Sequence, residues 1–455
     1  MRCRHLSRND AGRVLKAPTE RHTCFWLSHV NFRTGLAATI LTLHFADGTN
    51  LTVMPSPKWT FASRFRRNAF GWRSSLPIQR LKEAVSEIRS VARTDRPLAA
   101  DGAVLLLEKL SPALEHVDSS SGALGSAVNR AIEALVPLIA SADVTAAARQ
   151  RWLERLFDAL QDDQMPYIES LGEHWGTLCV TPALASDWAD RLLPLVTHVL
   201  EAKGFNYSVG VVPCLSALYA AGRFEEIVKL VRRDRLSSWW YRRWAVDALV
   251  CLGRPGDALR FAEASRGLNA PESAIARACE TILLDSGMTE EAYERYAIAA
   301  NRAGTYLATF RAIIKQYPEK TAETILSDLV RSEPGSEGKW FAAAKDAGLF
   351  DQAIALSRQS PTDPKTLIRA ARDFETKQSR FAMDCALCAL QWMEAGYGYE
   401  VSMADVADAY DALVAAATAS QISKAAVDDC VRRLIGNADS LVGRALRTRL
   451  EADRR

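Results

Sequence analysis

The feature that most constrains the fold of this chain is a pattern that recurs four times. Each copy reads as a helix, a glycine, a turn, an acidic residue and a second helix. The turn glycines are Gly222, Gly253, Gly287 and Gly348, at intervals of 31, 34 and 61 residues. Since the last interval is close to two periods, we expect a degenerate copy near Tyr317-Pro318. A period of about 31 to 34 residues is typical of stacked helical hairpins such as tetratricopeptide repeats.

Each position of this pattern has a physical role. Glycine tolerates the left-handed backbone conformation that ends the first helix. Acidic residues then fall in the first turn of the second helix, where they complement its dipole; they are Glu225, Glu226, Asp257, Glu290, Glu291 and Asp351. Mostly small residues follow, which lets the two helices approach closely; they are Ile227, Ala258, Ala292 and Ala353. The copies lack the full tetratricopeptide pattern of Trp, Tyr and Pro.

The rest of the chain supports an all-α fold. From about residue 78 onward, apolar residues recur at spacings of three and four, and strand signals are almost absent after residue 54. We therefore predict an α-solenoid of stacked, tetratricopeptide-like helical hairpins with a short irregular N-terminal segment. The predicted domains are an irregular leader over 1–53, a basic-aromatic segment over 54–82 and a helical repeat domain over 83–455, clearest over 210–360.

The N-terminal segment 1–53 differs from the remainder. It holds four of the seven histidines, and basic residues outnumber acidic ones. Alternating apolar residues around Asp47-Gly48 favour a weak β-hairpin; otherwise we expect disorder. The Arg-rich composition also suggests a transit peptide, but a sustained amphipathic period is missing. Our preferred hypothesis is a translated leader upstream of an initiator at Met54.

Composition and charge indicate which kinds of partner and which cellular compartment to expect. The net charge of +3 is too small to imply a nucleic-acid binder by itself. The nine cysteines are odd in number and irregularly spaced, which favours buried thiols in a reducing compartment over a disulfide framework. No uncharged apolar run approaches the roughly 18 to 20 residues that span a bilayer. We predict a cytoplasmic protein that does not associate with membranes.

Several sequence blocks carry a family resemblance. They include SPALEHVDSSSGALGSAVNRAIEALVPLI, PYIESLGEHWGTLC, TYLATFRAIIKQYPEK, EGKWFAAAKDAGLFDQAIAL and GYGYE. Together they resemble a family of bacterial, mainly proteobacterial, helical-repeat proteins of unknown function, over roughly residues 57–420. The resemblance implies the fold, a cytosolic bacterial origin and a family start near residue 54. It implies no activity.

Catalytic and metal-binding signatures are weak. Cys385 and Cys388 form a single C-x-x-C pair without the further ligands that zinc needs, so we interpret them as core residues. His174 lies near Cys179, but a Cys–His nucleophile requires an adjacency in space that sequence does not show. We predict no cofactor, no metal and no catalytic residue.

Two basic-aromatic stretches are candidates for polyanion binding. In 58–73, phosphates would contact Arg64, Arg66, Arg67 and Arg73, and bases would stack on Trp59, Phe65 or Trp72. In 229–244 the corresponding cations are Arg232 and Arg233. The alternative interpretation is ordinary packing, with Trp240 and Trp244, four residues apart, between hairpins and the arginines solvated.

A last candidate site follows the Gly-containing loop PGSEG. Lys339 and Trp340 stand there at the start of a helix, where the helix N-terminus and a lysine can hold an anion. Arg369 and Arg372, on the next predicted hairpin, are expected to reach the same groove. Otherwise Trp340 is a wedge between repeats.

These observations favour a non-catalytic scaffold that binds a protein or peptide, of unidentified sequence, on its concave face. Affinity would come from a few aromatic and arginine side chains. Two alternatives stay open, a nucleic-acid-associated protein that uses 58–73 and 229–244, and an enzyme with an unrecognised site.

Overall fold

The computed structural model describes residues 41–44, 50–53, 59–202, 208–234, 237–267, 270–435 and 440–452. The chain divides into two compact units, Met1–Trp59 and Thr60–Arg455. Each unit is described by itself.

The N-terminal unit contains an antiparallel pair of strands, β1 (Leu41–His44) and β2 (Asn50–Val53). Leu41 lies opposite Val53 and His44 lies opposite Asn50. The Asp47-Gly48 turn, the rest of the predicted leader and Met54 lie outside the described residues.

The second unit is helical. Its first elements are η1 (Phe61–Ser63), α1 (Ser75–Val91), α2 (Arg96–Leu114), α3 (Ala123–Ala140), α4 (Ala146–Gln161), η2 (Glu169–His174), α5 (Trp175–Cys179), α6 (Pro182–Glu201), α7 (Val211–Ala220), α8 (Phe224–Val231), α9 (Trp239–Cys251) and α10 (Pro255–Glu263). Its later elements are α11 (Glu272–Asp285), α12 (Thr289–Ala300), α13 (Tyr306–Gln316), α14 (Ala322–Ser332), η3 (Glu337–Trp340), α15 (Phe341–Asp346), α16 (Phe350–Gln359), α17 (Pro364–Phe374), α18 (Ser379–Glu394), α19 (Met403–Ala419), α20 (Lys424–Leu434) and α21 (Leu441–Ala452). The helical segment begins slightly before residue 78, at Ser75.

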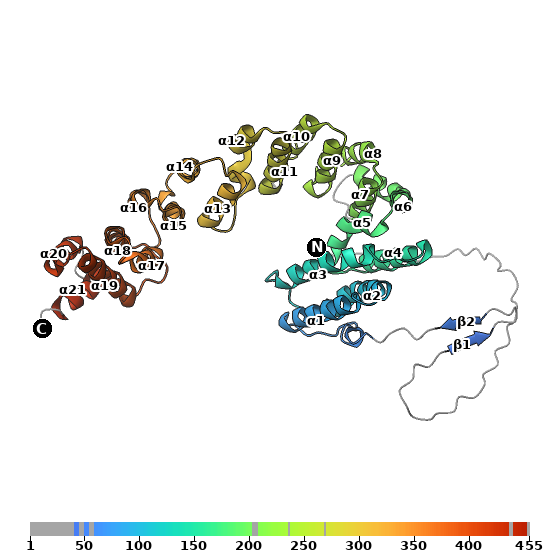
Figure 1. Ribbon diagram of the computed structural model, residues 1–455, viewed down its shortest axis with the longest axis horizontal. Coiled ribbons are helices and arrows are strands. Elements are labelled where there is room, and N and C mark those ends of the chain that lie inside the picture. Colours follow the sequence, from blue (N-terminus) through green and yellow to red (C-terminus); the bar gives the residue numbers. More distant parts are fainter. Residues whose placement is uncertain are drawn as a thin grey trace, which may run out of the picture. The chain divides into compact units, whose positions relative to one another are not determined.

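Helices contact chiefly their neighbours along the chain, as Figure 1 shows for the successive hairpins. For example, α11 packs on α12, α17 on α18, and α7 and α9 lie side by side in adjacent hairpins. The predicted fold class is confirmed: the helical unit is an α-solenoid of stacked helical hairpins. In such a fold each hairpin buries its apolar side only against its neighbours.

The four turn glycines have the predicted left-handed conformation. Their φ angles are 73° at Gly222, 71° at Gly253, 75° at Gly287 and 75° at Gly348. After Gly253, the amide of Arg254 donates to the carbonyl of Leu249 at 2.9 Å, and the amide of Gly253 donates to Val250 at 2.9 Å. This pair of bonds is the Schellman motif, which satisfies the last carbonyls of a helix.

Close helix packing and ion pairs accompany these turns. The residues predicted to allow close approach are all fully buried, namely Ile227, Ala258, Ala292 and Ala353. Arg254 pairs with Asp257 in its own hairpin at 2.6 Å and with Glu225 in the preceding one at 3.5 Å. These half-exposed pairs add little free energy each, but the Arg254–Glu225 pair links two neighbouring hairpins.

The helix break near Tyr317-Pro318 separates α13 from α14, as the period predicts, but it uses no glycine. Instead the amide of Lys320 donates to the Tyr317 carbonyl at 3.1 Å, and Thr321 caps α14 by accepting from the Thr324 amide at 3.2 Å. Another helix end with the same Schellman bond was not predicted. It has φ 59° at Gln421, and the pattern missed it because no glycine marks it.

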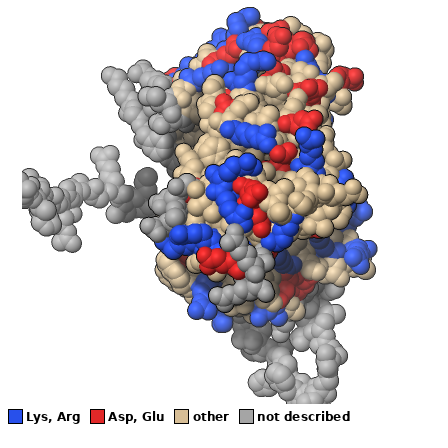
Figure 2. Space-filling view, turned by 90° about the vertical axis from the view of Figure 1, so that its left-hand side faces the viewer, with Lys and Arg blue, Asp and Glu red and all other residues tan. Residues whose placement is uncertain are grey.

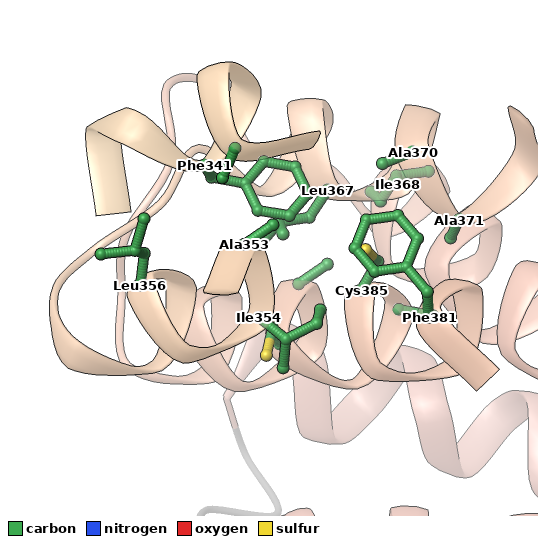
Figure 3. Packing of buried hydrophobic residues seen from close by; sticks show 14 of the residues in the cluster. Phe341, Ala353, Ile354, Leu356, Leu367, Ile368, Ala370, Ala371, Phe381 and Cys385 are labelled. Atoms are coloured by element: carbon green, nitrogen blue, oxygen red, sulfur yellow. The ribbon is translucent and has the colours of Figure 1, made fainter. Parts of the chain in front are cut away.

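The C-terminal hairpins share one continuous hydrophobic cluster that extends from Ala297 on α12 to Leu450 on α21. Within it the rings of Phe341 and Phe381 are parallel, with centroids 6.2 Å apart. Figure 3 shows these rings with Cys385 among the buried side chains. This continuity is what a stack of hairpins requires, since no hairpin has a closed core of its own.

One helix stands out for its apolar character. Among the helices described, α3 alone has the length and composition of a membrane span, and 44% of that 18-residue window is buried. It packs against α1, α2 and α5 of the same unit.

The turn geometry predicts opposite effects for two nearby glycines. Replacing Gly253 by Ala forces a Cβ into the left-handed region and should lower the free energy of unfolding by about 1 kcal/mol. Gly256→Ala, inside α10 with only the Arg260 guanidinium nearby, should raise it by about 0.5 kcal/mol. Urea unfolding followed by circular dichroism measures both. Equal effects of the two substitutions would contradict the assignment of the turn.

Candidate functional site

A pocket of about 210 Å³ opens where α12, α13 and η3 meet. Its lining residues are Ile298, Arg302, Ala303, Gly304, Thr305, Tyr306, Thr309, Glu333 and Trp340. They come from two consecutive hairpins and from the element that follows them. The pocket therefore lies at a junction between repeats.

The local sequence fixes the loop that forms one side of the pocket. Thr305 caps α13, since its hydroxyl accepts from the Ala308 amide at 3.1 Å. The hydroxyl of Thr309 accepts from the Ala303 amide at 2.9 Å, which folds the loop back onto the helix. The N-terminus of α13, the positive end of the helix dipole, thus lies at the pocket.

The most unusual group in the pocket is the indole of Trp340. This side chain is only 2% exposed, and its Nε1 has no hydrogen-bond partner among the described residues. The ring lies nearly perpendicular to that of Tyr306, with centroids 4.6 Å apart. A buried donor without an acceptor costs about 1–3 kcal/mol, so an acceptor supplied from outside would be favoured.

Charged groups contact other residues that line this pocket. The Tyr306 hydroxyl donates to Glu333 at 2.9 Å, and Arg302 forms an ion pair with the same carboxylate. The ammonium group of Lys339 lies 5.6 Å from the centroid of the Tyr306 ring. The Glu333 charge is therefore compensated by its two partners, and Lys339 and the α13 N-terminus add positive potential.

Gly338 positions Trp340. Its amide donates to the Ser360 hydroxyl at 2.8 Å, and its carbonyl accepts from the Thr362 hydroxyl at 3.0 Å. A Cβ at this position would lie 2.3 Å from the Ser360 carbonyl oxygen. Only glycine permits η3 to approach the segment after α16 so closely.

A buried carboxylate anchors the loop from the opposite side. Glu280 is 4% exposed and accepts from the Tyr317 hydroxyl and from Asn301 Nδ2, each at 2.7 Å. Asn301 begins the loop that lines the pocket, and Arg277 donates to the Ala300 carbonyl at 3.1 Å. Burial raises the pKa of the Glu280 carboxyl above its ordinary value, and the two donated hydrogen bonds only partly oppose this.

The predicted site residues separate into two groups. Trp340 lines the pocket, and the Lys339 ammonium lies over the ring of Tyr306, another lining residue. Arg369 instead donates to the Lys365 carbonyl and the Thr366 hydroxyl on its own helix, α17. Arg372 forms an ion pair with Asp408 of α19. Within the described ranges, no hydrogen bond or ion pair joins either arginine to Lys339.

Sequence reasoning missed Arg302, Tyr306 and Glu333. Only the capping threonine of TYLATF signals that a helix starts beside them. Their convergence depends on how two hairpins stack.

The first basic-aromatic stretch is partly built into the fold. Arg64 pairs with Glu83 at 2.9 Å and Arg67 with Glu115 at 3.6 Å. Arg66 and Arg73 are exposed. The prediction that bases stack on Trp59 and Phe65 is wrong, because both rings are buried and supply apolar surface at this end of the chain. Trp72, by contrast, is 72% exposed.

In the second stretch the packing interpretation is confirmed for Trp244, whose ring contacts that of Tyr219 on α7 with centroids 5.9 Å apart, and is wrong for Trp240. Trp240 is 64% exposed, whereas Trp239 is buried, because the helix turns Trp239 rather than Trp240 inward. Arg233 pairs with Glu201 at 2.7 Å, and Arg232 is exposed. On the face drawn in Figure 2, acidic and basic residues are intermixed rather than separated into a field of one sign.

The thiols are poorly suited to chemistry. Cys385 and Cys388 are buried in α18, and burial raises the pKa of Cys385. Burial likewise raises the pKa of Cys179 to about 12, so the thiolate that a nucleophile requires is disfavoured near His174. Within the part of the chain that the structure describes, no three His, Cys, Asp or Glu side chains group as a metal site.

Comparisons with known proteins add little. No family model matches the chain, and no curated protein matches it. One solved structure, described as "Crystal structure of APC/C hetero-tetramer Cut9-Hcn1", is 13% identical and covers 79% of this chain and 74% of that chain, with a TM-score of 0.22. A likeness at that TM-score supports no inference about function, and membership of the proteobacterial family stays a prediction.

The buried Glu280 predicts a pH-dependent stability. Because its pKa is higher in the folded than in the unfolded state, the folded state binds more protons above about pH 4.3, and the free energy of unfolding falls as pH rises. Glu280→Gln retains an acceptor oxygen but removes this titration. The melting temperature of wild type relative to this variant should therefore fall between pH 4 and pH 8. A difference independent of pH would contradict the raised pKa.

Proposed function

We propose that this protein is a non-catalytic scaffold that binds a protein or peptide, and that the pocket at Trp340 receives an acceptor group of that partner. The observation that carries the proposal is that Trp340 lines an open pocket while its buried indole N–H has no acceptor among the described residues. In the proposed complex the pocket belongs to the concave face that helical solenoids present to partners.

The proposed acceptor is a carboxylate, either a peptide C-terminus or an acidic side chain. Lys339 and the N-terminus of α13 favour negative charge, and Glu333 is already held by Arg302 and Tyr306. A volume of about 210 Å³ accommodates one side chain or terminal group rather than a whole metabolite of cofactor size.

The proposed setting is the bacterial cytoplasm. The seven described cysteines are all free thiols, and five of them are buried: Cys179, Cys214, Cys279, Cys385 and Cys388. Unpaired thiols in this number are expected in a reducing compartment.

Polyanion binding is a second candidate, supported by one specific observation. Trp72 is 72% exposed, its chain neighbour Arg73 is exposed, and Arg66 of the same segment is exposed as well. An aromatic ring flanked by cations can stack on a base of single-stranded nucleic acid. This candidate requires binding that weakens steeply with salt and is lost in Trp72→Ala.

A pair of tryptophan substitutions tests the main proposal. The full chain is screened against a peptide library that contains each sequence in matched forms. One pair of forms has a free C-terminal carboxylate or a C-terminal carboxamide. The other pair has Asp and Glu side chains or the corresponding Asn and Gln side chains. Enriched peptides should carry a carboxylate. Trp340→Phe removes one hydrogen bond to a charged acceptor, so affinity for them should fall about 10- to 100-fold.

Trp392→Phe is the matched control. The Trp392 indole donates to the Ser357 carbonyl at 2.7 Å, so this substitution should lower the melting temperature and leave peptide affinity unchanged. Trp340→Phe should do the reverse, because its donor has no partner to lose. Enrichment that ignores the carboxylate, or peptide affinity unaffected by Trp340→Phe, would refute the proposed site.

A further inference from the structure

A second surface of the helical unit has the character of a docking groove. It runs between α1 and α3 and has a volume of about 560 Å³. Its α1 wall carries Ile78, Leu81, Lys82, Val85, Ser86 and Arg89, which recur at spacings of three and four. From Ile78 to Arg89 these positions cover about three helical turns, or about 16 Å.

The floor of the groove is apolar and partly open. Val85 and Ile78 on α1 and Ala134 on α3 are half-buried, whereas Ala131 is buried. The floor belongs in part to α3, the one described helix with the apolar character of a membrane span. A recessed apolar strip between two helices matches the shape of an amphipathic helix.

The rim of the groove is basic. Lys82, Arg89 and Arg130 are exposed there, against a single acidic residue, Glu133. In the described part of the chain none of these three cations forms an ion pair closer than 4.0 Å.

The acidic residues of α1 are engaged elsewhere. Glu83 pairs with Arg64 at 2.9 Å and with Arg80 at 2.7 Å. Glu87 accepts from the amide and hydroxyl of Thr60, at 2.8 and 2.5 Å. The carboxylates of this helix thus hold the segment that precedes it, and the groove side keeps its positive charge.

We infer that this groove binds an acidic amphipathic helix of about three turns from a partner protein. Apolar side chains of that helix would enter the strip between α1 and α3, and its carboxylates would pair with Lys82, Arg89 and Arg130. The chain's own N-terminal segment is a poor occupant, since residues 1–53 hold seven Lys or Arg against three Asp or Glu. A membrane is also disfavoured, because the apolar strip is recessed rather than protruding.

Fluorescence anisotropy with labelled synthetic helices tests the inference on the full chain. The probes are 18-residue peptides with leucines at spacings of three and four and either Glu or Lys on both flanks. We expect the Glu peptides to bind at least about tenfold more tightly than the Lys peptides. The triple variant Lys82→Glu, Arg89→Glu, Arg130→Glu should reverse this preference, and Ala134→Trp should weaken binding of the Glu peptides by obstructing the groove.

The matched control is Arg151→Glu, Lys377→Glu, Arg380→Glu, which makes the same change of net charge at exposed positions on α4 and beside or within α18. It should change affinity for the Glu peptides less than about twofold. Equal loss in both triple variants, equal binding of Glu and Lys peptides, or no binding of any Glu peptide would overturn the inference.

Two further results would also overturn it. One is displacement of the Glu peptide by a peptide of residues 1–53. The other is that the protein binds vesicles of anionic phospholipid through Lys82, Arg89 and Arg130 and does not bind the Glu peptides. In a Trp340→Phe background, the triple variant Lys82→Glu, Arg89→Glu, Arg130→Glu should weaken binding of the Glu peptides by the same factor as in the wild-type background. The groove and the Trp340 pocket can therefore fail independently.

Discussion

Burial of each hairpin against its neighbours is the interaction on which the rest of this molecule depends. In the described C-terminal hairpins, buried apolar side chains form one cluster that continues from Ala297 to Leu450. This burial requires the two helices of a hairpin to approach closely. The left-handed turn at residues such as Gly253 and the small, fully buried side chain of Ala258 permit that approach. Stability is thus expected to be a sum of hairpin terms and nearest-neighbour terms rather than the property of one core.

The same arrangement explains where binding groups gather. A junction between hairpins brings together side chains that are distant in sequence, such as Glu280 with Tyr317 and Arg302 with Glu333. Most buried polar atoms at these junctions find partners within the chain. The indole N–H groups of Trp175, Trp244 and Trp340 are exceptions among the described residues, and of these three side chains Trp340 lines the pocket between α12, α13 and η3.

The Trp340 pocket and the groove between α1 and α3 differ in chemistry. The Trp340 pocket is small and polar, with compensated charges and one free donor, so it suits a single terminal or side-chain group. The groove between α1 and α3 is longer, apolar at its floor and basic at its rim, so it suits a helix. A scaffold that holds one partner by a short peptide and another by a helix would bring two proteins together without any catalytic centre.

The sequence by itself determined the fold class, the helical hairpins and the positions of their glycine turns. These features depend on contacts within about six residues, as at Gly222, Gly253, Gly287 and Gly348, where the local chemistry permits one conformation. Sequence also placed Lys339 and Trp340 at a candidate site. Only the tertiary structure decided which residues join them, because Arg302 and Glu333 arrive through the stacking register of separate hairpins, and Arg372 is drawn instead to Asp408. Packing also decided which aromatic rings of the basic-aromatic stretch 58–73 are buried. Phe65 is buried and Trp72 is exposed. The sequence pattern does not specify which ring faces the neighbouring helix.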